Sequence, residues 1–167
     1  CDDIRNHMLY FLENHDEQRI ASDFFAGSGR KAMPALIANA LMQQNPFMVY
    51  AGQEYGERGM DKEGFSGQDG KTTIFDYWSI DTLCRADANQ LTAEEQQLAD
   101  VYSKVLNFAR KEKAIGEGEM FDLMYVNQQY QRQYAFLRKA GKEIVLVVVN
   151  FDDAPVQMEI EDRKSVV

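Results

Sequence analysis

The stretch FLENHDEQRI, residues 11–20, decides how the rest of the chain is interpreted. It begins at the end of an apolar run, Met8 to Leu12, and continues into polar residues that include His15, Asp16 and Arg19. An unbroken apolar run of this length is typical of a strand that is covered on both faces in a parallel sheet. The polar residues then follow the carboxyl end of that strand, where they form either a solvated loop or the wall of an active site.

A second short apolar run, residues 47–51, ends at Gly52-Gln53-Glu54. Between the two runs, apolar residues from Arg30 to Gln44 recur at the spacing of a helix with one buried face. Strand, helix and strand in this order predict a βαβ unit, whose two strands are parallel. We therefore expect the polar residues after both strands to lie at one edge of one sheet, where α/β enzymes place their sites.

The remaining chain divides into a long irregular stretch, one helix and a series of strands. Residues 55–90 show no period, and loops of that length in compact chains are usually functional. Thr92 and Glu95 form a capping-box pattern that opens a helix over 93–115. After Gly116 the pattern predicts antiparallel strands at 121–126, 133–138, 143–150 and 156–160, with a hairpin turn at 140–142. The change of pattern predicts a domain boundary between 1–116 and 117–167.

Composition narrows the classes of partner. The chain has 167 residues and a net charge of −9, so it offers no basic surface for nucleic acid or an anionic membrane and fits a neutral ligand better. No apolar stretch is long enough to cross a bilayer, which predicts no transmembrane segment. The only two cysteines, Cys1 and Cys84, lie far apart and indicate neither a disulfide framework nor a zinc site. The cysteines do not indicate a cellular compartment.

The expected architecture is incomplete. Two parallel strands with one helix between them leave sheet faces and edges that need further strands and helices to cover them. We therefore expect the last two βα units of a larger barrel or doubly wound sheet, followed by an antiparallel unit that also stops early. Exposed strand edges of this kind favour self-association.

Several motifs, in order along the chain, resemble the alpha-amylase family of glycoside hydrolases. FLENHDEQR at 11–19 resembles the family's strand-seven motif, and NPFMVYAGQEYG at 45–56 resembles its eighth strand. TIFDYW at 73–78 resembles a sequence in the loop behind that strand. LNFARKEKAIGEGE at 106–119 is similar to the last barrel helix and the entry to the C-terminal β-sandwich, and VLVVVNF at 145–151 is similar to a strand of that sandwich.

The resemblance implies an α/β plus all-β fold, with strands seven and eight of a (β/α)8 barrel in 1–116 and a small antiparallel β-sandwich in 117–167. It implies retaining hydrolysis of α-glucosidic bonds in starch or maltodextrin. Asp16 matches the catalytic carboxylate that stabilises the transition state, and His15 matches a neighbouring substrate ligand, with Asn14 beside it. The nucleophile and the acid/base have no counterpart here, so the isolated chain is expected to be inactive.

The resemblance also bears on cofactors and on the residues that support the site. The resemblance implies no organic cofactor; family members often bind calcium through residues upstream, and residues 61–64 do not fit a calcium loop. Arg19 is expected to orient the Asp16 loop as an ion-pair partner, and Gln53 and Glu54 to support the site structurally. The aromatic residues of 75–78 either pin the long loop or stack on sugar rings, and pinning is the commoner fate.

Other functions stay open at this point. On local sequence alone, His15-Asp16 fits an ordinary loop or a helix N-cap. The whole chain also fits a noncatalytic carbohydrate-binding or interaction module derived from such a barrel, and a metal-dependent phosphate-ester enzyme with its ion at His15 is a third hypothesis. A polysaccharide-degrading parent favours a secreted, periplasmic or cell-surface location over the cytoplasm.

Overall fold

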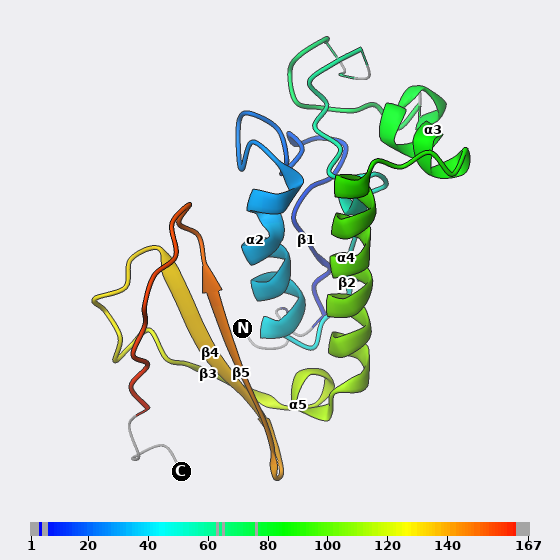
Figure 1. Cartoon of the computed structure of the whole chain (residues 1–167). Helices are drawn as coiled ribbons and strands as arrows, with labels where there is room; N and C mark the ends of the chain where they lie inside the picture. The colour runs from blue at the N-terminus through cyan, green and yellow to red at the C-terminus, as the bar shows by residue number, and fades with distance from the viewer. Residues whose placement is uncertain (1–3, 5–6, 63, 65, 76, 163–167) are drawn as a thin grey trace.

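The computed structural model describes residues 4, 7–62, 64, 66–75 and 77–162. Cys1 and the last residues of the predicted C-terminal unit, 163–167, therefore lie outside the described part. Two long helices, α2 (Gly29–Met42) and α4 (Ala93–Lys111), run side by side, and a separate antiparallel sheet lies against one side of them (Figure 1). The fold is mixed α/β, with two parallel strands and a small antiparallel sheet.

The predicted parallel strand pair is present but short. β1 (Tyr10–Phe11) pairs in parallel with β2 (Phe47–Met48), with Tyr10 opposite Phe47, so the predicted parallel pairing is confirmed. Full burial of the first run is wrong for the described residues, because Met8 and Leu9 are 47% and 51% exposed. The reason is that, among the described residues, only β1 and β2 form this sheet, so no further strand of this part of the chain covers the run.

Both long helices begin with a side-chain cap. The Ser28 hydroxyl accepts a hydrogen bond from the Lys31 N–H at the start of α2. Thr92 and Glu95 form the complete capping box that the sequence predicts at the start of α4. The predicted helix over 93–115 is divided, because α4 ends at Lys111 and a short α5 (Lys113–Gly116) follows. Leu36 of α2 packs on Leu98 and Tyr102 of α4 to form one core cluster.

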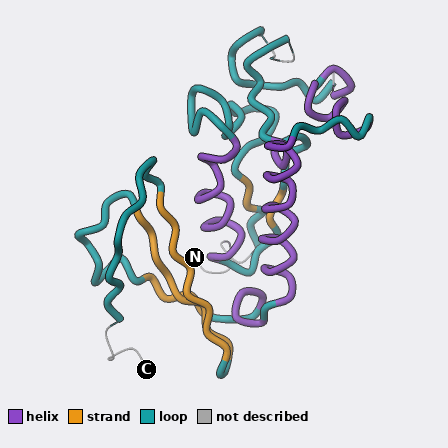
Figure 2. Tube along the Cα trace, viewed as in Figure 1, coloured by secondary structure: helices purple, strands orange, loops and turns teal. Residues whose placement is uncertain are grey.

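Two short helices lie in the segment predicted to be irregular, and a third ends at its first residue, Tyr55. They are η1 (Gln53–Tyr55), η2 (Tyr77–Ser79) and α3 (Asp81–Asp87). Figure 2 shows that the loops around them gather at one end of the molecule, beyond the first turn of α2. This end also carries the turn that follows β1, so the long segment and the polar turn share one region.

The antiparallel sheet has three strands in the order β3-β4-β5. They are β3 (Glu119–Asp122), β4 (Gln133–Ala140) and β5 (Glu143–Asn150), and Gly141 takes φ +60° in the tight turn between the last two. The predicted strand at 156–160 is wrong, because those residues have no regular secondary structure. The backbone next to this stretch is instead bonded to a side chain. The Asn127 side chain accepts the Glu161 N–H at 2.9 Å and donates to the Glu161 carbonyl at 3.0 Å.

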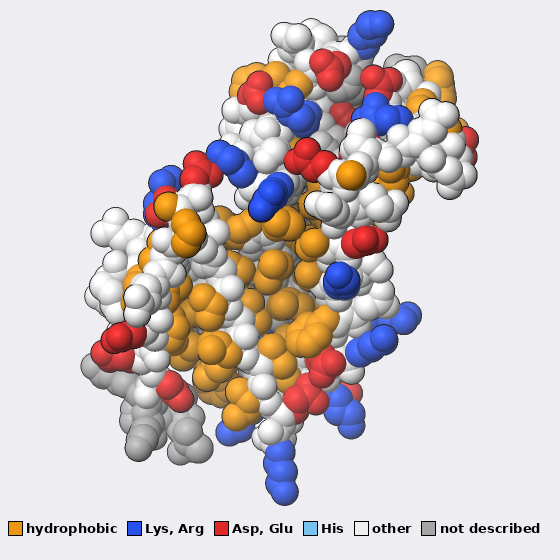
Figure 3. Space-filling model, in the orientation of Figure 1, with side chains coloured by type: hydrophobic (Ala, Val, Ile, Leu, Met, Phe, Trp, Pro, Cys, Tyr) orange, Lys and Arg blue, Asp and Glu red, His pale blue; other side chains and the backbone are white. Residues whose placement is uncertain are grey.

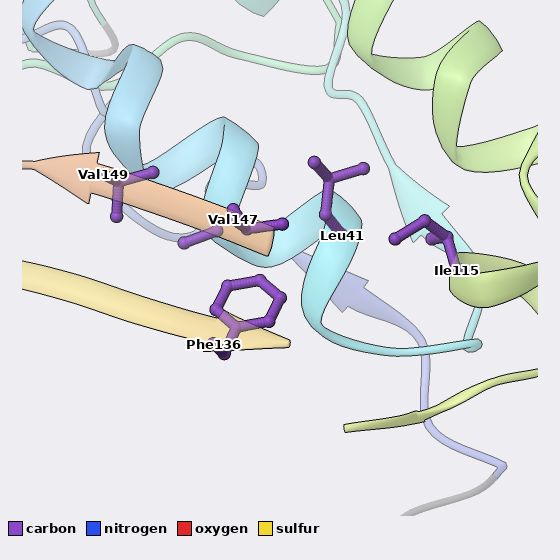
Figure 4. Close-up of a cluster of buried hydrophobic side chains, with 6 residues drawn as sticks. Leu41, Ile115, Phe136, Val147 and Val149 are labelled. Carbon is purple, nitrogen blue, oxygen red and sulfur yellow. The ribbon is translucent and has the colours of Figure 1, made fainter. Parts of the chain in front are cut away.

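One face of the sheet packs on α2 and α5 and forms the second core cluster. Side chains from both helices and both long strands point toward one another there: Leu41, Ile115, Phe136, Val147 and Val149 (Figure 4). Of the predicted helix over 93–115, α5 contributes the buried Ile115 to this cluster, and α4 contributes the partly buried Val105 and Ala109. Hydrophobic side chains gather in the middle of the face between the sheet and the two long helices, and charged side chains surround them (Figure 3).

A buried arginine joins the sheet to the helices. Arg138 of β4 is 2% exposed, and its guanidinium donates to four carbonyl oxygens, those of Met42, Ala114, Ile115 and Gly118. The Met42 carbonyl is at the end of α2, where the unpaired carbonyls of a helix attract positive charge. One side chain thus satisfies carbonyls at the ends of two helices.

Replacing Arg138 with Ala should lower the free energy of unfolding by about 3 kcal/mol or more, because hydrogen bonds to a charged group contribute about 1.5–3 kcal/mol each and buried carbonyls are left unpaired. Arg132→Ala is the matched control: Arg132 is 70% exposed at its side chain, and its change should stay within about 0.5 kcal/mol. Urea unfolding followed by circular dichroism measures both. Equal losses in the two variants contradict the role given to Arg138.

Candidate functional site

The turn after β1 presents two polar side chains to solvent. The Asn14 side-chain oxygen accepts hydrogen bonds from the N–H groups of Asp16 and Glu17, at 2.8 and 3.1 Å, and so closes the turn. The side chains of His15 and Asp16 are 50% and 76% exposed, and His15 Nε2 lies 3.5 Å from Asp16 Oδ1. The structure thus brings the three predicted site residues Asn14, His15 and Asp16 together in one exposed turn, with the Asn14 oxygen engaged in the turn itself.

Directly beneath this turn lies a buried ion pair. Arg19 Nη1 donates to Glu13 Oε1 at 2.6 Å, and both residues are fully buried. The other oxygen of Glu13 accepts the N–H of Ile20 at 2.6 Å. Glu13 and Arg19 therefore lie at the two ends of the loop that carries His15 and Asp16, and their pairing closes that loop from below.

The remaining donors of Arg19 reach two other segments. Its Nη2 donates to the carbonyl of Ala51 at 2.8 Å, just after β2, and its Nε donates to the Thr72 hydroxyl at 3.0 Å. The guanidinium also lies 4.2 Å from the centre of the Tyr50 ring, in a cation–π contact. Arg19 thereby fixes the end of β1 to the end of β2 and to the long loop.

Charge and burial oppose each other at Glu13. Burial raises the pKa of the Glu13 carboxyl above its ordinary value, while Arg19 and the Ile20 N–H lower it. A buried carboxylate without such partners is strongly unfavourable, so the stability of this region depends on the pair remaining intact.

Gln53 and Glu54 are engaged in the turn after β2. The Gln53 side chain is buried; its oxygen accepts the Tyr50 N–H at 3.2 Å, and its nitrogen donates to the Tyr102 hydroxyl of α4 at 3.0 Å. Burial raises the pKa of Tyr102, which keeps this hydroxyl neutral. Glu54 accepts the Gly52 N–H at 3.1 Å. These contacts stabilise the turn, and they occupy both residues within it.

The long loop is packed against the Asp16 turn. The Gly70 carbonyl accepts the Arg19 N–H at 2.6 Å, and Lys71 Nζ donates to the Asp16 carbonyl at 2.7 Å. Gly70 has φ +77°, and a Cβ there would lie 2.8 Å from Phe24 and 3.0 Å from Ser22. Only glycine fits this close approach without displacing its neighbours.

The aromatic residues that follow the loop do not pin it within the described part of the chain. Phe75, Tyr77 and Trp78 are 72%, 60% and 63% exposed there, so pinning of the loop onto a barrel stays a prediction. Polar groups anchor the long loop instead. The Thr72 hydroxyl accepts a hydrogen bond from Arg19, and Glu57 accepts one from the Thr82 hydroxyl at 2.6 Å.

Sequence reasoning missed Glu13, Thr72 and Tyr50 as parts of this arrangement. Glu13 carried a usable signal: a carboxylate at the end of an apolar run, six residues before an arginine, is expected to be buried with a partner. Thr72 lies 53 residues from Arg19, and no periodicity brings that pair together.

Within the described residues, no group of three or more His, Cys, Asp or Glu side chains is arranged to hold a metal ion. The same part of the chain contains no helix long and apolar enough to span a bilayer. No protein-family model matches the chain, and no curated protein matches it significantly.

Breaking the ion pair from either side should be strongly destabilising. Glu13→Leu or Arg19→Met alone should lower the free energy of unfolding by about 3–5 kcal/mol, because each leaves one charge buried without its partner. The double variant should lose much less than the sum of the two, since it leaves neither charge. A double-mutant cycle by chemical denaturation measures the difference, and purely additive losses contradict the pairing.

Proposed function

We propose that this chain is the C-terminal portion of an alpha-amylase-type retaining glycoside hydrolase that cleaves α-glucosidic bonds in starch or maltodextrin. In this proposal β1 and β2 are strands seven and eight of a (β/α)8 barrel, and the β3-β4-β5 sheet belongs to a C-terminal β-sandwich. The proposal rests on the ordered motifs of the sequence, and no relative supports or opposes it.

One structural observation carries the proposal furthest. β1 and β2 are parallel neighbours, and the exposed His15-Asp16 turn follows the first while the Gln53-Glu54 turn follows the second. Arg19 ties the two strand ends together through the Ala51 carbonyl. This is the edge of a parallel sheet at which barrel enzymes carry their catalytic groups.

Asp16 has the properties that its proposed role requires. The carboxylate is exposed, and the loop beneath it is held by a buried ion pair, so it is presented to a ligand from a fixed base. A carboxylate placed at the reacting sugar stabilises the positive charge that develops in an oxocarbenium-like transition state. In this scheme His15 and Asn14 bind substrate hydroxyls, and Arg19, Gln53 and Glu54 keep the turns in position.

The reaction also needs a carboxylate nucleophile and a carboxylic acid about 5–5.5 Å apart. The proposal assigns both to segments of a longer parent protein, which also provides any calcium site. The second candidate function, a noncatalytic carbohydrate-binding or interaction module, is favoured by one fact: the motifs in this chain supply neither of those two groups.

In the intact parent, Asp16→Asn should lower kcat by about 10²–10³-fold, because losing one electrostatic contact to the transition state costs about 3–4 kcal/mol. Glu17→Gln is the matched control, since Glu17 is an exposed carboxylate in the same turn, and it should leave kcat close to normal. Initial rates on soluble maltooligosaccharides measure both. A normal kcat in Asp16→Asn excludes this residue from the mechanism.

The isolated chain should not hydrolyse α-glucans, because general acid and nucleophile are both absent from its motifs. The purified chain is incubated with soluble starch and with a chromogenic maltoside, and reducing ends are measured. Turnover above the buffer control that Asp16→Asn abolishes would show that the catalytic pair lies within these residues. Such a result would overturn the assignment of the chain as a fragment.

A further inference from the structure

An exposed group of aromatic residues follows the loop that contacts the Asp16 turn. It consists of Phe75, Tyr77 and Trp78, which we call the aromatic surface, and all three side chains are more than half exposed. Tyr77 and Trp78 pack edge to face, with ring centres 5.2 Å apart. Aromatic residues bury large areas when they can, so three exposed rings in one short segment indicate a surface that is covered by something else.

The backbone that carries these rings is anchored. Ile80, two residues after Trp78, is 2% exposed, and the Cys84 thiol of α3 donates to the Trp78 carbonyl at 2.9 Å. α3 is in turn held by the buried hydrogen bond from Thr82 to Glu57 and by an ion pair from Arg85 to Glu95 at the start of α4. The rings therefore project from a supported segment and are not the result of a loose loop.

The segment with these rings lies at the end of the molecule that carries the Asp16 turn. Lys71, four residues before Phe75, donates to the Asp16 carbonyl, and Thr72 bonds to Arg19. The loop, η2 and α3 all lie at the end of the molecule that also carries the turn after β1 (Figure 1). The segment that carries the rings therefore lies at the same end of the molecule as the turn that carries Asp16.

We propose that the aromatic surface binds a neutral oligosaccharide segment, specifically an α-glucan chain, by stacking sugar rings on Phe75, Tyr77 and Trp78. This inference rests on the proposed function for its choice of glucan. Sugar rings present apolar C–H faces together with hydroxyl edges, which match the apolar faces of aromatic side chains and the polar tips of Tyr and Trp. The net charge of −9 disfavours nucleic acids and other anionic ligands that also stack on aromatic rings.

The surface gives a direct readout, because Trp78 is the only tryptophan in the chain. Titration of the isolated chain with maltoheptaose should change the tryptophan emission in a saturable way, without any need for catalysis. No saturable change up to about 10 mM, the weak end of specific binding, overturns the proposal.

Variants then locate the contact. Tyr77→Ala should weaken maltoheptaose binding by about tenfold, measured by Trp78 emission, since that corresponds to the loss of one stacking contact. Tyr125→Ala is the matched control, because Tyr125 is 76% exposed and lies between β3 and β4, and it should bind normally. Equal affinity in the two variants overturns the assignment, and circular dichroism confirms that both are folded.

Two further outcomes separate this inference from its alternatives. Light scattering on the same proteins tests a second copy as the occupant: a dimer that Tyr77→Ala dissociates, with unchanged sugar affinity, overturns the proposal. Sugar binding at Trp78 and hydrolysis by the parent are measured separately. Sugar binding at Trp78 combined with an inactive parent therefore rejects the proposed hydrolase and keeps the binding surface, whereas an active parent without binding at Trp78 rejects the surface alone.

Discussion

The guanidinium of Arg19 is the interaction on which the candidate site depends. It has donors in a fixed plane, and each must find an acceptor once the side chain is buried. The acceptors come from the end of β1, the end of β2 and the long loop, through Glu13, Ala51 and Thr72. The hydrogen bonds of this one side chain therefore hold together three segments that are far apart in sequence. The exposed turn with His15 and Asp16 lies above them.

The positive charges of the two buried arginines, Arg19 and Arg138, are compensated in different ways. Arg19 faces a carboxylate, so its charge is neutralised by a full opposite charge. Among the described contacts Arg138 faces only backbone carbonyls, and burial lowers the pKa of its guanidinium. Helix-end dipoles compensate that charge in place of an acid. The first arrangement positions a surface turn, and the second holds a sheet against helices.

Elements with strong local signals were predictable from sequence. The capping box of Thr92 and Glu95, the helix over α2 and the hairpin at Gly141 all follow from short-range chemistry that survives in the structure. The strand at 156–160 failed because an apolar alternation says nothing about the amide of Asn127, which takes the neighbouring backbone bonds. The same limit applies to the site: the turn at Asn14 to Asp16 was visible in the sequence, whereas the pairing of Arg19 with Thr72 depends on tertiary packing.

Arg138 also has a consequence for strand register. It lies opposite Val145 of β5 and Met120 of β3, and its neighbours Leu137 and Lys139 point to the other face of the sheet. A shift of β4 by one residue would turn the guanidinium away from the helices and bring a leucine or a lysine to four carbonyls that it now binds. β5 carries hydrophobic residues on both faces, so these residues discriminate poorly between registers. Arg138 supplies alignment that the valines do not, together with the hydrogen bond from the Gln133 side chain to Asn150.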